Sequence, residues 1–150
     1  MASPQLVAVV PCEDLLQTVA WPDRRPTLHR VFYDLIARQF PARARIPITV
    51  IFCGGSGTYA GRVRLVDPAE QEVASGDFAF IAATFFVQLV VFGGAGNLVE
   101  LPFPGKYNIE VLLEEQVIAR VPLTVVLDQS AVATVAETER APQAAVLNEA

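Results

Sequence analysis

The chain has 150 residues, of which 53% are hydrophobic and only 18% are charged, so it holds enough apolar material for one buried core. That composition excludes intrinsic disorder of the whole chain. A net charge of -5 and a pI near 4.8 argue against a general nucleic-acid binder, whose contact surface is basic.

The N-terminal part predicts two strands separated by a short helical segment and a loop. Residues 5–11 (QLVAVVP) are typical of a mostly buried strand, and residues 13–20 (EDLLQTVA) indicate one or two helical turns. The sequence WPDRRP at 21–26 is rich in turn formers. Residues 27–36 then predict a second strand, in which neither alternating set of side chains is cleanly apolar.

The middle of the chain predicts four further strands, at residues 48–53, 58–66, 71–74 and 78–92. In the second of these, Arg62 and Arg64 alternate with Val63 and therefore face the other way. The last is the longest, with a bulge or kink around Ala82 and Ala83 as an open alternative. At 15 residues (FAFIAATFFVQLVVF) it is too short for a membrane-spanning helix, so a buried strand in a cytoplasmic protein is expected.

The segment 103–126 carries the clearest pattern in the chain and predicts a hairpin. Tyr107, Ile109 and Val111 fall on one face of its first strand, while Asn108 and Glu110 fall on the other, wet face. A tyrosine at the start of such a strand favours a tyrosine corner, in which its hydroxyl bonds backbone a few residues upstream. The alternative is that Tyr107 is a plain core aromatic.

These elements together predict an all-β protein: a single antiparallel sandwich of about seven or eight strands with immunoglobulin-like, Greek-key connectivity. The sandwich occupies residues 1–127 and includes a minor extended piece between GGAGN at 93–97 and the hairpin. From residue 128 to 150 the composition shifts to Ala, Glu, Gln and Thr. We expect this tail to be loosely ordered, either disordered or partly helical.

Three pieces in this order are similar to a known group: PQLVAVVPCEDL at 4–15, the segment 25–73, and FPGKYNIEVLLEEQVIARVPLTV at 103–125. Within them lie an acidic doublet after a cysteine, a G-x-x-x-x-R-V-R-L-V-D-P strand at 57–68 and a P-G-x-Y entry at 104–107. The chain thereby resembles small bacterial proteins of an uncharacterised domain-of-unknown-function family. The resemblance implies a cytosolic, immunoglobulin-like sandwich and assigns no activity, ligand or catalytic residue.

Residues with catalytic or metal-binding chemistry are few. Cys12, Glu13, Asp14 and His29 are the basis of an enzymatic reading, but no motif links a nucleophile to a base, so we expect no enzyme. Two cysteines and one histidine match no zinc spacing, and the acids supply too few oxygens for calcium, so no cofactor or metal is expected. Whether Cys12 and Cys53 pair is left open; two reduced thiols are the simpler reading.

Two further features are compatible with ligand binding but have simpler explanations. The GGSG and GGAG loops lack the Lys and the following helix of a phosphate-binding loop, and hairpin turns explain them. The arginines form one basic concentration, which could contact phosphates or an acidic partner but also suits a solvated rim. Its members are Arg24, Arg25, Arg30, Arg38, Arg43 and Arg45.

The sharpest functional indication is that the 78–92 segment is apolar on both faces, with only Thr84 and Gln88 as polar interruptions. Something must cover the second face, since a wet apolar surface forgoes about 25 cal/mol per Å². We therefore expect a non-enzymatic interaction or self-assembly module, a homo-oligomer or one that binds a protein partner. The alternative is a small-ligand-binding sandwich that uses the same strand. The interaction residues expected are Phe78, Phe80, Phe85, Phe86, Leu89 and Phe92.

Overall fold

The computed structural model describes residues 3–17, 26–82, 84–92, 95–128 and 144–147. These residues form a four-stranded, a six-stranded and a two-stranded sheet, and one turn of 3-10 helix, η1 (Ala95–Asn97). The four-stranded sheet has the order β2 (Pro26–Val31), β1 (Gln5–Gln17), β5 (Pro47–Cys53), β8 (Phe86–Val91). The six-stranded sheet has the order β12 (Ala144–Leu147), β3 (Asp34–Ala37), β11 (Gln116–Leu127), β10 (Gly105–Leu113), β6 (Thr58–Val66), β7 (Glu72–Ile81). The two-stranded sheet pairs β4 (Ala42–Ala44) with β9 (Val99–Leu101).

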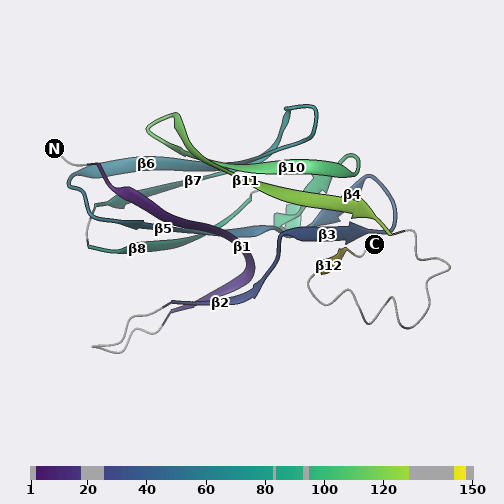
Figure 1. Ribbon diagram of the computed structural model, residues 1–150, viewed down its shortest axis with the longest axis horizontal. Coiled ribbons are helices and arrows are strands. Elements are labelled where there is room, and N and C mark those ends of the chain that lie inside the picture. Colours follow the sequence, from purple (N-terminus) through teal and green to yellow (C-terminus); the bar gives the residue numbers. More distant parts are fainter. Residues whose placement is uncertain (1–2, 18–25, 83, 93–94, 129–143, 148–150) are drawn as a thin grey trace.

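The two large sheets lie as layers with the core between them (Figure 1). In the four-stranded sheet, β5 is the central strand and pairs antiparallel with both β1 and β8. In the six-stranded sheet, β10 lies between β6 and β11, antiparallel to both. The predicted all-β fold is therefore confirmed, but the expected single sandwich of about seven or eight strands is wrong, because the strands are more numerous and form three sheets.

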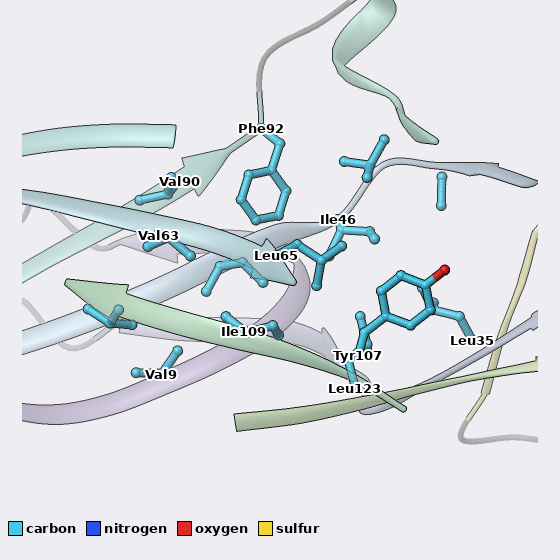
Figure 2. Packing of buried hydrophobic residues seen from close by; sticks show 14 of the residues in the cluster. Val9, Leu35, Ile46, Val63, Leu65, Val90, Phe92, Tyr107, Ile109 and Leu123 are labelled. Atoms are coloured by element: carbon cyan, nitrogen blue, oxygen red, sulfur yellow. The ribbon is translucent and has the colours of Figure 1, made fainter. Parts of the chain in front are cut away.

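The core is built from the alternating side chains that the sequence pattern assigned to it. Val63 and Leu65 of β6 and Ile109 of β10 are fully buried between the layers, together with Phe92, which follows β8 (Figure 2). Tyr107 is also fully buried, and its hydroxyl donates to the backbone carbonyl oxygen of Phe103 at 2.6 Å. The expected tyrosine corner is thus confirmed, and it gives the one polar atom of this ring a partner.

One glycine is required by the close approach of a ring. Gly61 of β6 lies opposite Phe78 of β7, and a Cβ atom at Gly61 would overlap the Phe78 ring. Phe78 belongs to an aromatic cluster in which Phe80 stacks on Phe86 with ring centroids 4.5 Å apart and on Phe52 at 4.9 Å. This cluster joins β7 of one sheet to β5 and β8 of the other.

The long strand expected at 78–92 does not exist as one strand. Residues 78–81 are the end of β7 in the six-stranded sheet, whereas 86–91 are β8 in the four-stranded sheet. The chain crosses between the layers in the short link that contains Ala82. The segment 78–92 is apolar on both alternating faces because its two halves pack into the core from different sheets. Most of its apolar side chains are therefore covered within one chain, without a partner.

The same kind of crossing breaks the strand expected at 27–36. Its first part is β2 of the four-stranded sheet, and its second part is β3 of the six-stranded sheet, with Phe32 and Tyr33 between. The parallel pairing of β3 with β11 corrects the expectation of a purely antiparallel fold. The helical turns expected at 13–20 are also wrong as far as Gln17, because β1 continues to that residue; 18–20 lie outside the described residues.

The C-terminal segment contributes one described strand. Residues 144–147 form β12, which pairs parallel with β3, so these four residues are a strand within the tail expected at 128–150 to be disordered or partly helical. The remainder of the tail from 129 lies outside the described residues. Among the residues that are described, none belongs to a helix that is long and apolar enough to cross a membrane.

Candidate interaction surfaces

The six residues expected to meet a partner fall into different environments. Phe78, Phe80 and Phe92 are buried in the core, so in the folded chain a partner cannot reach them. Phe86 is half-buried against the same aromatic cluster. Phe85, in the link before β8, is 47% exposed, and Leu89 of β8 is half-buried on the side away from the core. Only these last two residues face outward.

Leu89 belongs to an apolar outer face of the four-stranded sheet. In the register of β1, β5 and β8, Val10 and Leu89 flank Thr49, and Ala8 and Val87 flank Ile51. The core-facing residues of β5 are the intervening ones, so this set points outward. We call it the apolar face; its members are Ala8, Val10, Thr49, Ile51, Val87, Leu89 and Val91.

Neighbouring side chains shield the centre of the apolar face. Thr49 is fully buried and Ile51 is 9% exposed, although both point away from the core. The surrounding residues, among them Val10 and Val87, are half-buried. The face is therefore a continuous apolar layer that is only partly withdrawn from water, without a charged side chain among its members.

Strand β8 is also an edge strand of the four-stranded sheet, and its Val91 end lies against Gly76 of β7. Its described pairing is with β5 alone, so the opposite row of backbone groups forms no described strand ladder. Its sequence, FVQLVV, contains neither charge nor proline, the residues with which proteins commonly protect an edge strand. The residue at its centre, Gln88, is exposed and uses its amide to bond the Leu89 carbonyl oxygen at 3.0 Å.

The residues of the enzymatic reading lie on the neighbouring strands β1 and β2. Cys12 is buried, and its Sγ lies 3.2 Å from the Thr49 hydroxyl oxygen. Burial raises the pKa of the Cys12 thiol, which is the opposite of what a nucleophile needs. His29 is opposite Asp14 on β2, while Glu13 forms an exposed ion pair with Arg30 at 3.2 Å.

Both cysteines are free thiols, and within the described part of the chain no three metal-ligating side chains come together. Three of the arginines expected to form a basic concentration around residues 24–45 contact acidic residues. Arg30 pairs with Glu13, Arg43 lies 3.9 Å from Glu100, and Arg45 donates to the Glu13 carbonyl oxygen at 3.1 Å. Arg24 and Arg25 lie outside the described residues. Arg30 and Arg45 thus meet at Glu13, whereas Arg43 pairs with Glu100.

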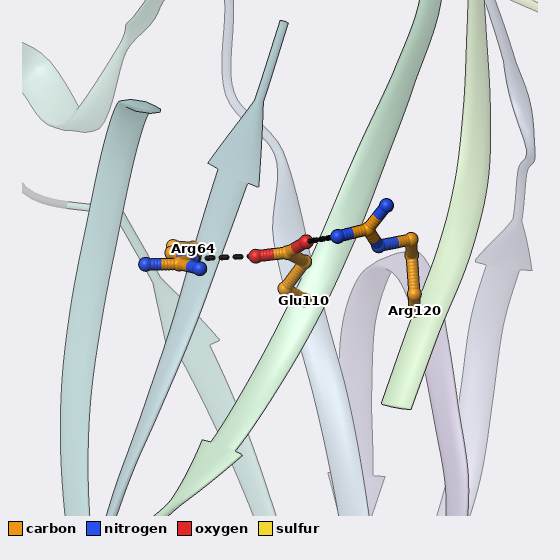
Figure 3. A network of polar contacts seen from close by, with 3 residues as sticks. All are labelled: Arg64, Glu110 and Arg120. Atoms are coloured by element: carbon orange, nitrogen blue, oxygen red, sulfur yellow. Dashed lines mark hydrogen bonds and ion pairs between the residues drawn. The ribbon is translucent and has the colours of Figure 1, made fainter. Parts of the chain in front are cut away.

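The outer face of the six-stranded sheet is charged, and its centre is a buried carboxylate. Glu110 of β10 is only 1% exposed, although it points away from the core. Arg64 of β6 donates from Nε to Glu110 Oε1 at 2.6 Å, and Arg120 of β11 pairs through Nη2 with Oε2 (Figure 3). Each carboxylate oxygen thus has its own arginine, one from each neighbouring strand. We call these three residues the Arg–Glu–Arg row.

A second charged pair lies beside this row. Arg62 donates from Nε to Asp77 Oδ1 at 2.8 Å, and this bond raises the pKa of Arg62. The pair borders a shallow depression of about 610 Å³, which is also lined by Leu112, Glu114 and Glu115. Of the 78–92 segment, only Phe78 and Ala79 line this depression, so it gives no support to a ligand pocket built on β8.

Sequence reasoning placed Glu110 on the wet face and missed its burial. The alternation of the strand correctly gave the direction of the side chain, but not what covers it. The sequence does contain a signal for this burial. Arg62 and Arg64 alternate in the strand at 58–66, and Glu110 and Arg120 lie in the two strands of the hairpin at 103–126. Cross-strand pairing of opposite charges would have linked them.

Together, the layers and their surfaces define an all-β protein of several sheets, with one apolar and one charged outer face. The chain belongs to the family described as "Family of unknown function (DUF6941)", whose profile matches residues 18–126. The family resemblance given by the sequence is thereby confirmed. No curated protein matches the chain.

Solved structures with a similar arrangement are distant in sequence. Two are of a glycosyl hydrolase family 2 member from Bacteroides cellulosilyticus, at 13% and 14% identity, each with a TM-score of 0.38. They match 56% and 55% of this chain, which spans only 13% and 12% of theirs. A third is an immunoglobulin-like protein from Pseudomonas aeruginosa, at 8% identity and a TM-score of 0.36. That match covers 83% of this chain and 97% of the other.

Proposed function

We propose that the chain is a non-enzymatic interaction module that associates with a second copy of itself through β8. The observation that carries this proposal is the edge of β8, which is uncharged, apolar and hydrogen-bonded on one side only among the described strands. Such an edge gains backbone hydrogen bonds when another strand is added to it. Among the residues that the structure describes, the buried thiol and the exposed ion pair of the enzymatic reading give a catalytic role no support.

The sequence of β8 favours an identical strand as the partner. In antiparallel pairing about a two-fold axis perpendicular to the sheet, residues on the same face meet, so Gln88 lies opposite Gln88 and Val87 opposite Leu89. No like charges oppose each other, because the strand has none. The two central amides can bond each other, and the valine and leucine form apolar cross-strand pairs.

The apolar face supports the same proposal. Val87, Leu89 and Val91 of β8 are outward and half-buried in one copy. Pairing of two β8 strands joins the apolar faces of both copies, so each edge residue gains apolar neighbours across the junction. At about 25 cal/mol per Å², several hundred Å² of further burial would contribute several kcal/mol toward association.

Light scattering coupled to size-exclusion chromatography tests the proposal. The unmodified chain is expected to run with twice the mass of one chain at about 10–100 μM, a range that suits micromolar dissociation constants. Val87→Lys introduces a charge at the centre of the pairing and is expected to give a monomer. Val126→Lys is the matched control, because Val126 is an outward valine of the six-stranded sheet, 40% exposed, and its change should leave the mass doubled.

Two outcomes contradict the proposal. One is a strict monomer for the unmodified chain across this concentration range. The other is an equal loss of mass in the two lysine variants, because association would then not depend on β8. Phe86 of the same strand is left unchanged in these variants, because its ring stacks on Phe80 in the core cluster and its loss would disturb the fold.

A further inference from the structure

We propose that Arg64 and Arg120, held together by Glu110, form a binding site for a single phosphate group. The site lies on the outer face of the six-stranded sheet, and phosphate binding there does not depend on association through β8. On this face the Glu110 carboxylate is buried, while the side chains of the two arginines that cover it reach solvent.

The positions of the three residues follow from the strand order. Glu110 of the central strand β10 lies directly opposite Arg64 of β6 and Arg120 of β11. The arginines approach the carboxylate from its two sides and bind different oxygens of it (Figure 3). Their guanidinium groups are thereby brought to one spot from two strands that are not neighbours, at a fixed orientation.

The two arginines of the row have further N–H donors besides those that bind Glu110. Each guanidinium carries five N–H groups and uses one of them in its bond to Glu110. The three side chains carry a net charge of one positive unit, from two arginines and one glutamate. Because the Glu110 side chain is 2% exposed while those of Arg64 and Arg120 are 32% and 52% exposed, an approaching ligand meets the cations and not the carboxylate.

The neighbouring charges limit the size of the ligand. Arg62 is balanced by Asp77, and Glu72 and Glu115 act on it as well, so the surface on the Arg62 side of the row is acidic. A polyanion such as nucleic acid would extend onto these acids and be repelled. A single phosphate group fits within the row, and its several oxygens suit two guanidinium forks that converge from different strands better than one carboxylate does.

The test is a titration of the folded chain with inorganic phosphate at constant ionic strength and pH 7, followed by the NMR signals of the arginine Nε–H groups. We expect saturable shifts at Arg64 and Arg120, and smaller, non-saturating ones at Arg43, whose side chain is 69% exposed. Acetate in a parallel titration is expected to bind about tenfold more weakly, since it offers fewer acceptors.

Variants separate recognition from simple charge. Arg120→Lys keeps the charge but removes the fork, and is expected to weaken phosphate binding about tenfold. Arg62→Gln removes a neighbouring charge and should change the phosphate affinity less than about twofold. Non-saturating shifts at all arginines, or phosphate affinity in Arg120→Lys equal to that of the parent, would overturn the proposal. Backbone spectra of each variant check that it is folded.

Discussion

The outer faces of the two large sheets differ in the residues that cover an outward-pointing side chain. Each has an outward side chain that is nevertheless buried: Ile51 in the four-stranded sheet and Glu110 in the six-stranded sheet. Ile51 is covered by apolar neighbours, which leaves an apolar surface toward solvent. Glu110 is covered by Arg64 and Arg120, whose guanidinium groups contact its carboxylate oxygens while the two arginine side chains remain partly exposed. The chemistry of the covering residues, and not the direction of the buried one, decides which face can attract an apolar partner.

The largest effect in this comparison is expected from Glu110→Ala. It leaves two arginines facing each other without their carboxylate, and we expect a loss of about 3 kcal/mol in the free energy of unfolding, as for other broken buried ion pairs. Urea denaturation measures it. Asp77→Ala is the matched control, because it removes the carboxylate from the exposed Arg62 pair and should cost less than about 1 kcal/mol. Equal losses in both variants would mean that burial of Glu110 has no energetic consequence.

A smaller effect is expected from Ile51→Ala on the apolar face. Since Ile51 is 9% exposed, truncating it should cost about 2 kcal/mol through lost burial and a partial cavity. Urea denaturation of dilute protein, where association does not contribute, gives the value. Val87→Ala, at a half-buried neighbour, should cost about 1 kcal/mol or less. If Ile51→Ala proves harmless, the apolar face is not packed within one copy.

Alkaline pH is expected to lower the free energy of unfolding through Cys12, which lies at the margin of the apolar face. Burial raises the pKa of the Cys12 thiol. A raised pKa means that the folded chain holds the thiol proton more tightly than the unfolded chain does. The corresponding stability is complete below the unfolded-state pKa of about 8.5 and is lost as pH rises through the folded-state pKa. Chemical denaturation between pH 7 and 10 should show a decline that Cys12→Ala reduces; an identical decline in that variant would contradict the assignment.

The smallest effect is expected from Thr49→Val. Thr49 is fully buried on the apolar face, and its hydroxyl contacts only a weakly polar thiol at 3.2 Å. Replacing it by an apolar group of similar shape should change the free energy of unfolding by less than about 1 kcal/mol, in contrast to Glu110→Ala. The same urea experiment provides the comparison. A loss as large as that of Glu110→Ala would show that this face depends on polar contacts too.

The sequence by itself determined those elements in which local alternation and turn chemistry agree. The strands at 58–66 and 105–127, their inward residues, and the bond of Tyr107 to the backbone could all be read from the chain, because side-chain direction in a strand follows residue parity. The family resemblance followed from motifs in these segments together with the pieces at 4–15 and 25–73.

Only the tertiary structure decided which sheet each strand joins and what covers its outer side. The segments 27–36 and 78–92 each look like one strand, because an apolar run has the same pattern whether it stays in a sheet or crosses to the next. The shielding of Glu110 depends on arginines from two other strands, and the apolar face on the register of β1, β5 and β8. Parity fixes the direction of a side chain, but burial is a property of its neighbours, and those come from distant parts of the chain.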